Sequence, residues 1–290
     1  MSNPLITLYT PGIRPELITK AAKYNPDAVI IDLEDTVPRE MKPDVRGQIA
    51  DLIPTLPNRP LVRVNNEEEF LVDDLRATVT ASTLGIIIPK VETVDNLAVV
   101  DKTIAAAEKE AGLDTDSMPL ILQIESALGV LRCYELCTAL PRVASVTFGS
   151  AEDGDLQQDL GCAFSVEGTE LLYARSKVLL DARAAKLPYV LDGAFSEIGN
   201  DEALRADCVL SHRLGYDGRT LIHPGQIAVA RSVYALSEEQ SAHYKRVVRE
   251  FEAALKRGDA SIKVNDRLID YAMYNQARSV LTRLEPDFFD

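Results

Sequence analysis

Short apolar runs alternate with longer amphipathic stretches along most of the chain. Each apolar run has about the length of a β-strand, and the stretches between them have the apolar spacing of helices that bury one face. The runs that predict strands are Leu5–Thr10, Ala28–Asp35, Pro60–Asn65, Leu84–Lys90, Pro119–Glu125, Val143–Gly149, Tyr189–Ala194 and Arg219–His223. The fifth run is almost wholly apolar and ends at Glu125, which is typical of a parallel strand buried on both faces.

The intervening pattern predicts helices and a fold class. Helices are expected at Arg39–Ile53, Thr93–Ala111, Ala127–Thr138, Gly168–Ala185 and Asp201–Leu214. Eight strands, each followed by a helical segment, favour an α/β fold of the (β/α)8 TIM barrel type over a doubly wound sheet. No G-x-G-x-x-G follows the first strand, which argues against a Rossmann domain.

The C-terminal part of the pattern differs from the rest. After His223 it is purely helical through Lys256, and Gly258–Lys263 then interrupts it. A TIM barrel commonly takes roughly 250 residues, so the 290-residue chain has residues to spare. We therefore expect a barrel domain over residues 1–257 and a C-terminal helical extension over residues 258–290.

Composition and charge exclude several classes of partner. The chain carries 31 Lys and Arg residues against 45 Asp and Glu residues, which gives a formal net charge of −14. Such a charge disfavours nucleic acid and anionic membranes as partners, and a phosphate-bearing ligand would need a local basic cluster. No apolar run approaches the roughly 20 residues that span a bilayer, and the first ten residues lack the features of a signal peptide. A cytoplasmic location is the expectation.

Charged and polar residues gather where the expected strands end. Barrel enzymes keep their catalytic groups at the carboxyl ends of the strands. Seven of the eight expected strands carry such a residue near that end. These residues include Asp32, Glu34, Asp35, Arg63, Lys90, Glu125, Glu152, Asp153, Asp155, Asp192 and His223.

Two of these strand ends suggest a divalent cation. Glu125 and an acidic residue after strand six would lie on neighbouring strands, and Mg2+ commonly takes one or two protein carboxylates together with water. Arg63 would face this pair across the mouth as a fork for a substrate carboxylate. The alternative is that Arg63 only forms an ion pair with Glu125 or Asp35.

A series of short motifs also carries a family resemblance. The motifs are PGIRPE at 11–16, IDLED at 31–35, LVRVN at 61–65, IIPKVE at 87–92, QIES at 123–126, DLG at 159–161, YAR at 173–175, LDG at 191–193 and GRTLIHPGQI at 218–227. In this order and spacing they resemble the citrate lyase β-subunit-like (CitE-like) proteins of the HpcH/HpaI aldolase superfamily. The resemblance implies a (β/α)8 barrel that binds Mg2+ and cleaves or forms carbon–carbon bonds in 3-hydroxyacyl thioesters.

The resemblance also implies roles for residues at the strand ends. Glu125 and Asp153 would be the Mg2+ ligands, and Arg63 would hold the carboxylate of a 2-oxo acid. Asp35 would contact substrate and water beside the metal. The segment after Gly149 is about two residues longer than the family pattern, so Asp155 is an alternative to Asp153. Asp153 is preferred because it lies closer to the strand end.

The C-terminal segment and the first helix complete the implied site. VNDRLIDYAMYNQA, at Val264–Ala277, resembles the closing motif of the family's acyl-CoA lyases. It implies that Asp270 is the catalytic acid/base and that the segment acts as a lid on a neighbouring subunit, in a trimer or a hexamer. Arg14 and Lys20 match family positions near coenzyme A. From the residues alone, Asp270 would be a helix N-cap, and Arg14 and Lys20 would belong to a solvated helix face.

The expected function is therefore an Mg2+-dependent lyase that cleaves or forms a 3-hydroxyacyl-CoA, such as citramalyl-CoA, malyl-CoA or citryl-CoA. The products would be acetyl-CoA and a 2-oxo acid. Three alternatives stay open: a thioesterase of the malyl-CoA type, a 2-oxo acid aldolase that does not need CoA, and a citrate lyase complex subunit acting on a carrier-protein thioester.

Overall fold

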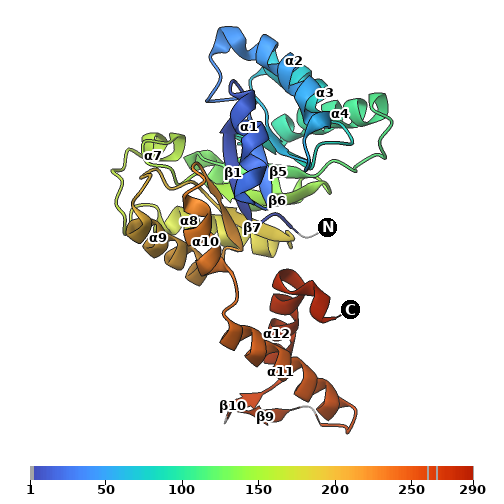
Figure 1. Cartoon of the computed structure of the whole chain (residues 1–290), viewed down its shortest axis with the longest axis vertical. Helices are drawn as coiled ribbons and strands as arrows, with labels where there is room; N and C mark the ends of the chain where they lie inside the picture. Colours follow the sequence, from blue (N-terminus) through green and yellow to red (C-terminus); the bar gives the residue numbers. More distant parts are fainter. Residues whose placement is uncertain (1–2, 260, 266, 290) are drawn as a thin grey trace. The chain divides into compact units, whose positions relative to one another are not determined.

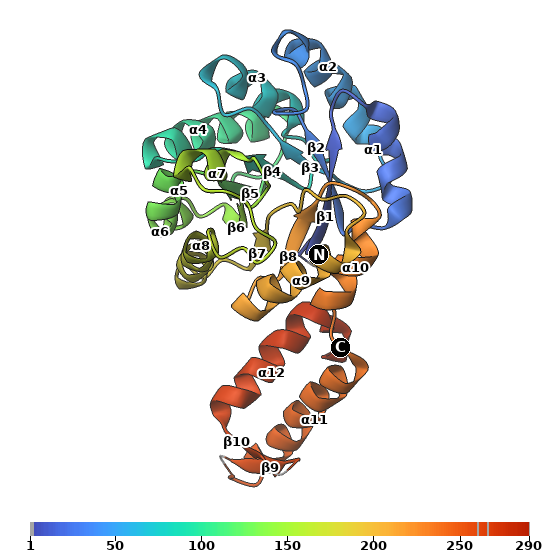
Figure 2. The ribbon, with the colours of Figure 1, turned by 90° about the vertical axis from the view of Figure 1, so that its left-hand side faces the viewer.

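The predicted barrel is confirmed by the computed structural model, which describes residues 3–259, 261–265 and 267–289. Eight parallel strands form a closed ring in chain order, with β1 paired to β8, and helices surround the ring (Figures 1 and 2). The strands are β1 Ile6–Pro11, β2 Ala28–Asp32, β3 Leu61–Arg63, β4 Gly85–Ile88, β5 Leu120–Ile124, β6 Val143–Phe148, β7 Tyr189–Asp192 and β8 Gly218–Leu221. All eight coincide with runs identified in the sequence.

The barrel helices follow their strands. They are α1 Pro15–Ala21, α2 Lys42–Leu52, α3 Glu68–Thr78, α4 Val94–Glu110, α5 Ala127–Leu131, α6 Cys133–Thr138, α7 Asp155–Leu160, α8 Leu172–Ala184, α9 Asp201–Leu214 and α10 Gln226–Tyr234. The single helix expected over Ala127–Thr138 is divided at Arg132, whose ψ of 8° departs from the helical value. The first of the two helices begins at Ala127 as expected, and the hydroxyl of Ser126, its N-cap, accepts a hydrogen bond from the Gly129 amide.

The strands read as apolar runs because both of their faces are buried. Along β2, Ile30 packs with Leu61, Ile87 and Ile121 in a small cluster of its own. Its neighbour Ile31 belongs to the larger cluster that the helices complete. Since successive side chains of a strand point to opposite faces, one apolar residue fills the ring and the next binds the helix layer.

The described residues divide into two compact units, Pro4–Ser232 and a second one that contains Asn3 and the described residues from Val233 onward. The second unit contains α11 Glu238–Leu255, the hairpin of β9 Ile262–Val264 with β10 Arg267–Ile269, and α12 Tyr271–Leu284. The unit begins earlier than the boundary expected after residue 257, because α11 packs on α12. The Phe251 and Tyr274 rings, for example, stack with centroids 4.7 Å apart.

Two further features of the structure concern the sequence expectations. The β9–β10 hairpin was not predicted, because its strands have only three residues each. Among the described residues, no helix is long and apolar enough to cross a lipid bilayer.

Candidate active site

A cavity of about 280 Å³ lies at the carboxyl ends of the barrel strands. Its lining comes from the ends of several strands and from the loops that follow them, which is the position where TIM barrels carry active sites. Residues in the lining that bear on chemistry are Tyr9, Asp32, Asp35, Arg63, Gln123, Glu125, Ser150 and Asp155. The site expected at this rim is therefore hollowed and lined by the expected residue types.

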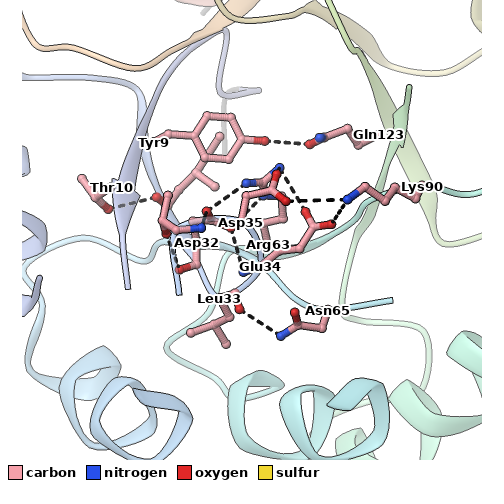
Figure 3. A network of polar contacts seen from close by, with 12 residues as sticks. Tyr9, Thr10, Asp32, Leu33, Glu34, Asp35, Arg63, Asn65, Lys90 and Gln123 are labelled. Carbon is pink, nitrogen blue, oxygen red and sulfur yellow. Dashed lines mark hydrogen bonds and ion pairs between the residues drawn. The ribbon is translucent and has the colours of Figure 1, made fainter. Parts of the chain in front are cut away.

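Arg63, at the end of β3, is the centre of a buried ion-pair network (Figure 3). Its Nε and Nη2 atoms donate to the two carboxylate oxygens of Asp32, each at 2.8 Å. Its Nη1 atom lies 3.1 Å from both Glu34 and Asp35. Burial alone would raise the pKa of Asp32, but the Arg63 guanidinium more than offsets it and holds this pKa below its usual value. The ion pair with Asp35, expected as an alternative role for Arg63, is present.

Lys90 supplies the second cation of this network. Its Nζ atom lies 2.9 Å from Glu34, 3.6 Å from Asp35 and 3.4 Å from Asp155. Partial burial would lower the pKa of Lys90, but the hydrogen bond to Glu34 and the surrounding carboxylates raise it. The side chain therefore stays charged at neutral pH.

Glu125 follows β5 and is held by groups of the chain itself. Its Oε1 accepts a hydrogen bond from the Lys90 backbone amide at 3.0 Å, and its Oε2 accepts one from the Gln123 side chain at 2.5 Å. Gln123 in turn accepts a hydrogen bond from the Tyr9 hydroxyl at 2.8 Å. Burial is the main reason why the pKa of Glu125 rises from 4.5 to about 7, and the nearby Glu34 and Asp155 charges add to it.

These residues form a cluster with an excess of negative charge. We call Asp32, Glu34, Asp35, Arg63, Lys90, Glu125 and Asp155 the rim cluster, in which five carboxylates face two cations. Burial raises the pKa of Glu34 as well, and its Oε2 makes no hydrogen bond although Arg63 lies nearby. A divalent cation would offset this excess, and carboxylate oxygens are the ligands that Mg2+ prefers.

The acidic residues after β6 are placed differently from the expectation. Asp153 is exposed and does not line the cavity, and its backbone has a left-handed φ of 56°. Asp155 begins α7, lines the cavity and reaches Lys90. The structure thus brings Asp155, and not Asp153, to the cavity beside Glu125.

Within the ranges that the structure describes, no group of three or more His, Cys, Asp or Glu side chains is arranged to hold an ion. A metal in the cavity would therefore be held by one or two carboxylates and complete its shell with water or substrate, as is common for Mg2+.

Arg14 and Lys20 do not line this cavity. Arg14 immediately precedes α1 and forms an ion pair with Glu16 at 2.5 Å, while Lys20 is exposed in the last turn of α1. Asp270 is the N-cap of α12 in the second unit, where its Oδ1 accepts a hydrogen bond from the Met273 amide at 3.1 Å. The cap predicted from the residue type is confirmed, and the roles toward coenzyme A and in catalysis stay predictions.

Tyr9, Gln123 and Lys90 make contacts in this site that the sequence pattern did not predict. Gln123 is a polar residue within the otherwise apolar β5, and Tyr9 interrupts the apolar face of β1. A polar side chain inside a fully buried parallel strand must find a partner, so this signal was available. The contact of the Lys90 backbone with Glu125 had no such signal, because it depends on a left-handed φ of 53°.

Comparisons with known proteins give a consistent result. The model of the family described as HpcH/HpaI aldolase/citrate lyase matches residues 5–224. The citrate lyase subunit beta of Escherichia coli K12 is 32% identical over 282 residues, covering 96% of this chain and 92% of that protein. A (3S)-malyl-CoA thioesterase of Cereibacter sphaeroides is 30% identical, covering 96% and 93%.

A solved structure agrees with these matches. The crystal structure of CitE from Mycobacterium tuberculosis in complex with magnesium, acetoacetate and coenzyme A has a TM-score of 0.74 and 26% sequence identity. The alignment covers 97% of each chain.

Proposed function

Because the chain belongs to the HpcH/HpaI aldolase/citrate lyase family, as its motifs predicted, we propose that it is an Mg2+-dependent carbon–carbon lyase. Its substrate would be a 3-hydroxyacyl-CoA such as malyl-CoA, citramalyl-CoA or citryl-CoA, and its products acetyl-CoA and a 2-oxo acid. The observation that carries the proposal is the rim cluster, of which four carboxylates and Arg63 line a cavity of about 280 Å³, while Glu34 and Lys90 pair with these residues from behind the lining. A cavity of this volume suits the acid part of the substrate, while coenzyme A would extend outside it.

Glu125 and Asp155 would hold the cation in this proposal, with Asp155 in place of the Asp153 expected from the sequence. When bound, a divalent cation supplies Lewis-acid polarisation of substrate oxygens. Gln123 and the Lys90 amide already fix both oxygens of Glu125, so this carboxylate needs little reorganisation. The choice of Mg2+ as the cation is supported by the CitE structure, which is a complex with magnesium.

Arg63 would bind the carboxylate of the 2-oxo acid through Nη1. The other two donor positions, Nε and Nη2, are engaged by Asp32. Nη1 faces Asp35, whose side chain is 52% exposed and can move away toward solvent. The incoming carboxylate would replace Asp35 on the guanidinium, and Asp35 could then accept a hydrogen bond from substrate or water in the cavity.

Asp270 would act as the acid/base of the reaction. Cleavage of the carbon–carbon bond leaves a thioester enolate, which needs one proton to become the acetyl group, and a positioned carboxyl group can supply it. In the direction of condensation the same carboxylate would remove that proton. We propose that Asp270 reaches the cavity of a neighbouring subunit in a homotrimer or hexamer, and that Arg14 and Lys20 contact coenzyme A.

A thioesterase is the second candidate, because a (3S)-malyl-CoA thioesterase is almost as similar to this chain as the citrate lyase subunits are. A carrier-protein thioester, used within a citrate lyase complex, and a free 2-oxo acid are the remaining alternatives. The candidates differ in their products. A lyase releases acetyl-CoA and a 2-oxo acid, whereas a thioesterase releases free CoA and an intact hydroxy acid.

The test is an assay of the purified full-length protein with (3S)-citramalyl-CoA and malyl-CoA, each with and without Mg2+. We expect Mg2+-dependent release of pyruvate or glyoxylate, and a loss of at least ~100-fold in the Asp270→Asn variant. Release of free CoA without a 2-oxo acid would replace the lyase by the thioesterase. No turnover of either thioester by folded protein that binds Mg2+ would overturn both and direct the search to carrier-protein or free-acid substrates.

A further inference from the structure

Lys90 touches both carboxylates that are proposed to hold the metal. Its backbone amide donates to Glu125 at 3.0 Å, and its Nζ atom lies 3.4 Å from Asp155. The same Nζ atom lies between Glu34 and Asp35, at 2.9 and 3.6 Å. One residue therefore binds the acidic side of the cavity through its main chain and neutralises it through its side chain, whose contact with Glu34 is drawn in Figure 3.

The backbone at Lys90 is held in a costly conformation. Its φ of 53° is left-handed, which is unfavourable for a residue with a Cβ atom. The Asn66 side chain helps to fix it, because its Nδ2 donates to the carbonyl oxygens of Pro89 and Lys90 at 2.9 and 3.3 Å. Unfavourable backbone conformations held by neighbouring groups are frequent at functional sites. Here the left-handed backbone directs the amide of Lys90 to Glu125.

The ammonium group stands where the excess negative charge is greatest. Three of the five rim carboxylates lie within 3.6 Å of it, whereas Glu125 contacts only the backbone of the same residue. The Lys90 side chain is 43% exposed, so it can leave this position without crossing packed atoms. It can therefore act as a replaceable cation.

We propose that Lys90 is the counter-cation of the metal-free site, which occupies the acidic cluster and competes with the divalent cation for it. The inference rests on the proposed function, since it assumes that Glu125 and Asp155 bind the metal. In the metal-free protein the ammonium keeps Glu34, Asp35 and Asp155 together. When the metal binds, the ammonium is repelled and becomes available to anionic substrate at the mouth of the cavity.

If Lys90 is a competing cation, removal of its charge should change the Mg2+ affinity in the opposite direction to the change expected if Lys90 only positions the metal ligands. A tether that positions the ligands would weaken metal binding when removed. A competing cation would strengthen it, because the removal of one positive charge a few ångströms away lowers the repulsion on Mg2+. The Lys90→Met variant makes the distinction, because it keeps the unbranched side chain and the backbone amide and removes only the charge.

The experiment measures Mg2+ binding by calorimetry, and the melting temperature in EDTA, for the full-length wild type and three variants. Lys90→Met should bind Mg2+ about tenfold more tightly. It should also melt about 2–4 °C lower in EDTA, because the rim carboxylates lose a counter-charge. Lys90→Arg, which keeps the charge, should bind Mg2+ within about twofold of the wild type.

Lys186→Met is the matched control. Lys186 also has a left-handed backbone, with φ of 64°, but it is exposed in the turn before β7, at the opposite end of a barrel strand from the cavity. The same chemical change there should alter neither Mg2+ affinity nor the response to EDTA.

The outcomes separate this inference from the proposed function. If the wild type binds Mg2+ and Lys90→Met binds it no more tightly, the counter-cation role is overturned and the proposed metal site stands. If the wild type binds no Mg2+, the proposed metal site is overturned, and the melting temperature in EDTA then decides the role of Lys90. In that case, a Lys90→Met protein that melts in EDTA at the same temperature as Lys186→Met would overturn the counter-cation role of Lys90.

Discussion

Two of the buried charge clusters in the barrel differ in the balance of their charges. The first is the rim cluster, with its excess of carboxylates. The second, which we call the β7–β8 cluster, consists of Arg175, Asp192, Asp207 and Arg219. Asp207 bridges the two guanidinium groups there, at 2.8 Å from Arg175 and 2.7 Å from Arg219.

The difference in charge balance accompanies a difference in the pKa values of the buried carboxylates. In the β7–β8 cluster two arginines face two aspartates. Burial would raise the pKa of Asp207, but the charges of Arg219 and Arg175 outweigh this effect and hold the pKa below its usual value. In the rim cluster, burial dominates and raises the pKa values of Glu34 and Glu125. Raised pKa values of buried carboxylates are frequent at functional sites, which favours the rim cluster over the β7–β8 cluster as the candidate active site.

The largest expected effect comes from the same substitution made in both clusters. Asp207→Asn should lower the free energy of unfolding by about 3–5 kcal/mol, because it leaves two buried guanidinium groups with one carboxylate. Glu34→Gln should leave it unchanged or raise it by up to about 1 kcal/mol, because it removes a buried charge that is in excess. Urea unfolding of both variants in EDTA checks this. A loss at Glu34 as large as that at Asp207 would contradict the comparison.

The next effect is a dependence of stability on pH. The pKa of Glu125 rises from 4.5 in the unfolded chain to about 7 in the fold, so between these values the folded state keeps a proton that the unfolded state has released. Stability from this group is thus fully present at low pH and is lost as the pH rises to about 7, by about 3 kcal/mol. Unfolding of the metal-free protein at several pH values should show this loss. Glu125→Gln serves as the reference, and a difference between the two proteins that does not grow with pH would refute the assignment.

A comparable effect should distinguish the two acidic residues after β6. Asp155→Asn should raise the Mg2+ dissociation constant by about 100-fold, or about 2.7 kcal/mol, because it removes a proposed ligand. Asp153→Asn is the matched control and should leave the constant within about twofold, because this residue does not line the cavity. Calorimetric titration with Mg2+ measures both. The reverse order would restore the assignment made from the sequence.

The smallest effect concerns the hydrogen-bond chain behind Glu125. Tyr9→Phe removes the hydroxyl that orients Gln123, and it should weaken Mg2+ binding by about fivefold, or about 1 kcal/mol. Tyr189→Phe is the control, since Tyr189 is another buried tyrosine on a barrel strand, with a hydroxyl that bonds Ser145. It should cost stability to a similar extent without changing the Mg2+ titration. Equal effects of the two variants on metal binding would show that Tyr9 has no special role.

The sequence pattern was sufficient to predict the fold, because the fold is indicated by many weak signals that agree with one another. Each of the eight strands is a buried apolar run, and the polar residues at their ends converge once the ring closes. Arg63, Glu125 and Asp35 were placed at the cavity in this way. The reasoning requires only that parallel strands share one carboxyl end.

The remaining features depend on local geometry that a pattern does not contain. The choice between Asp153 and Asp155 turned on a left-handed residue and on the start of α7, which a count of residues from the strand end does not reveal. The packing of α11 on α12 could not be predicted from the pattern, because α11 looks like any amphipathic helix until its partner is known. The contact between the Lys90 amide and Glu125 likewise follows from one backbone angle.

The pairing of β1 with β8 has a consequence for the order of folding. It joins Ile6 to Arg219 and Leu8 to Leu221, so the ring cannot close until almost the whole barrel sequence is available. Contacts of such high sequence separation form slowly, because loop entropy must be lost before they are gained. The rim cluster draws on β2 to β5 and the start of α7, so it can assemble on the growing sheet. Arg219 of the β7–β8 cluster lies on the closing strand itself, and we expect its burial to report the final step.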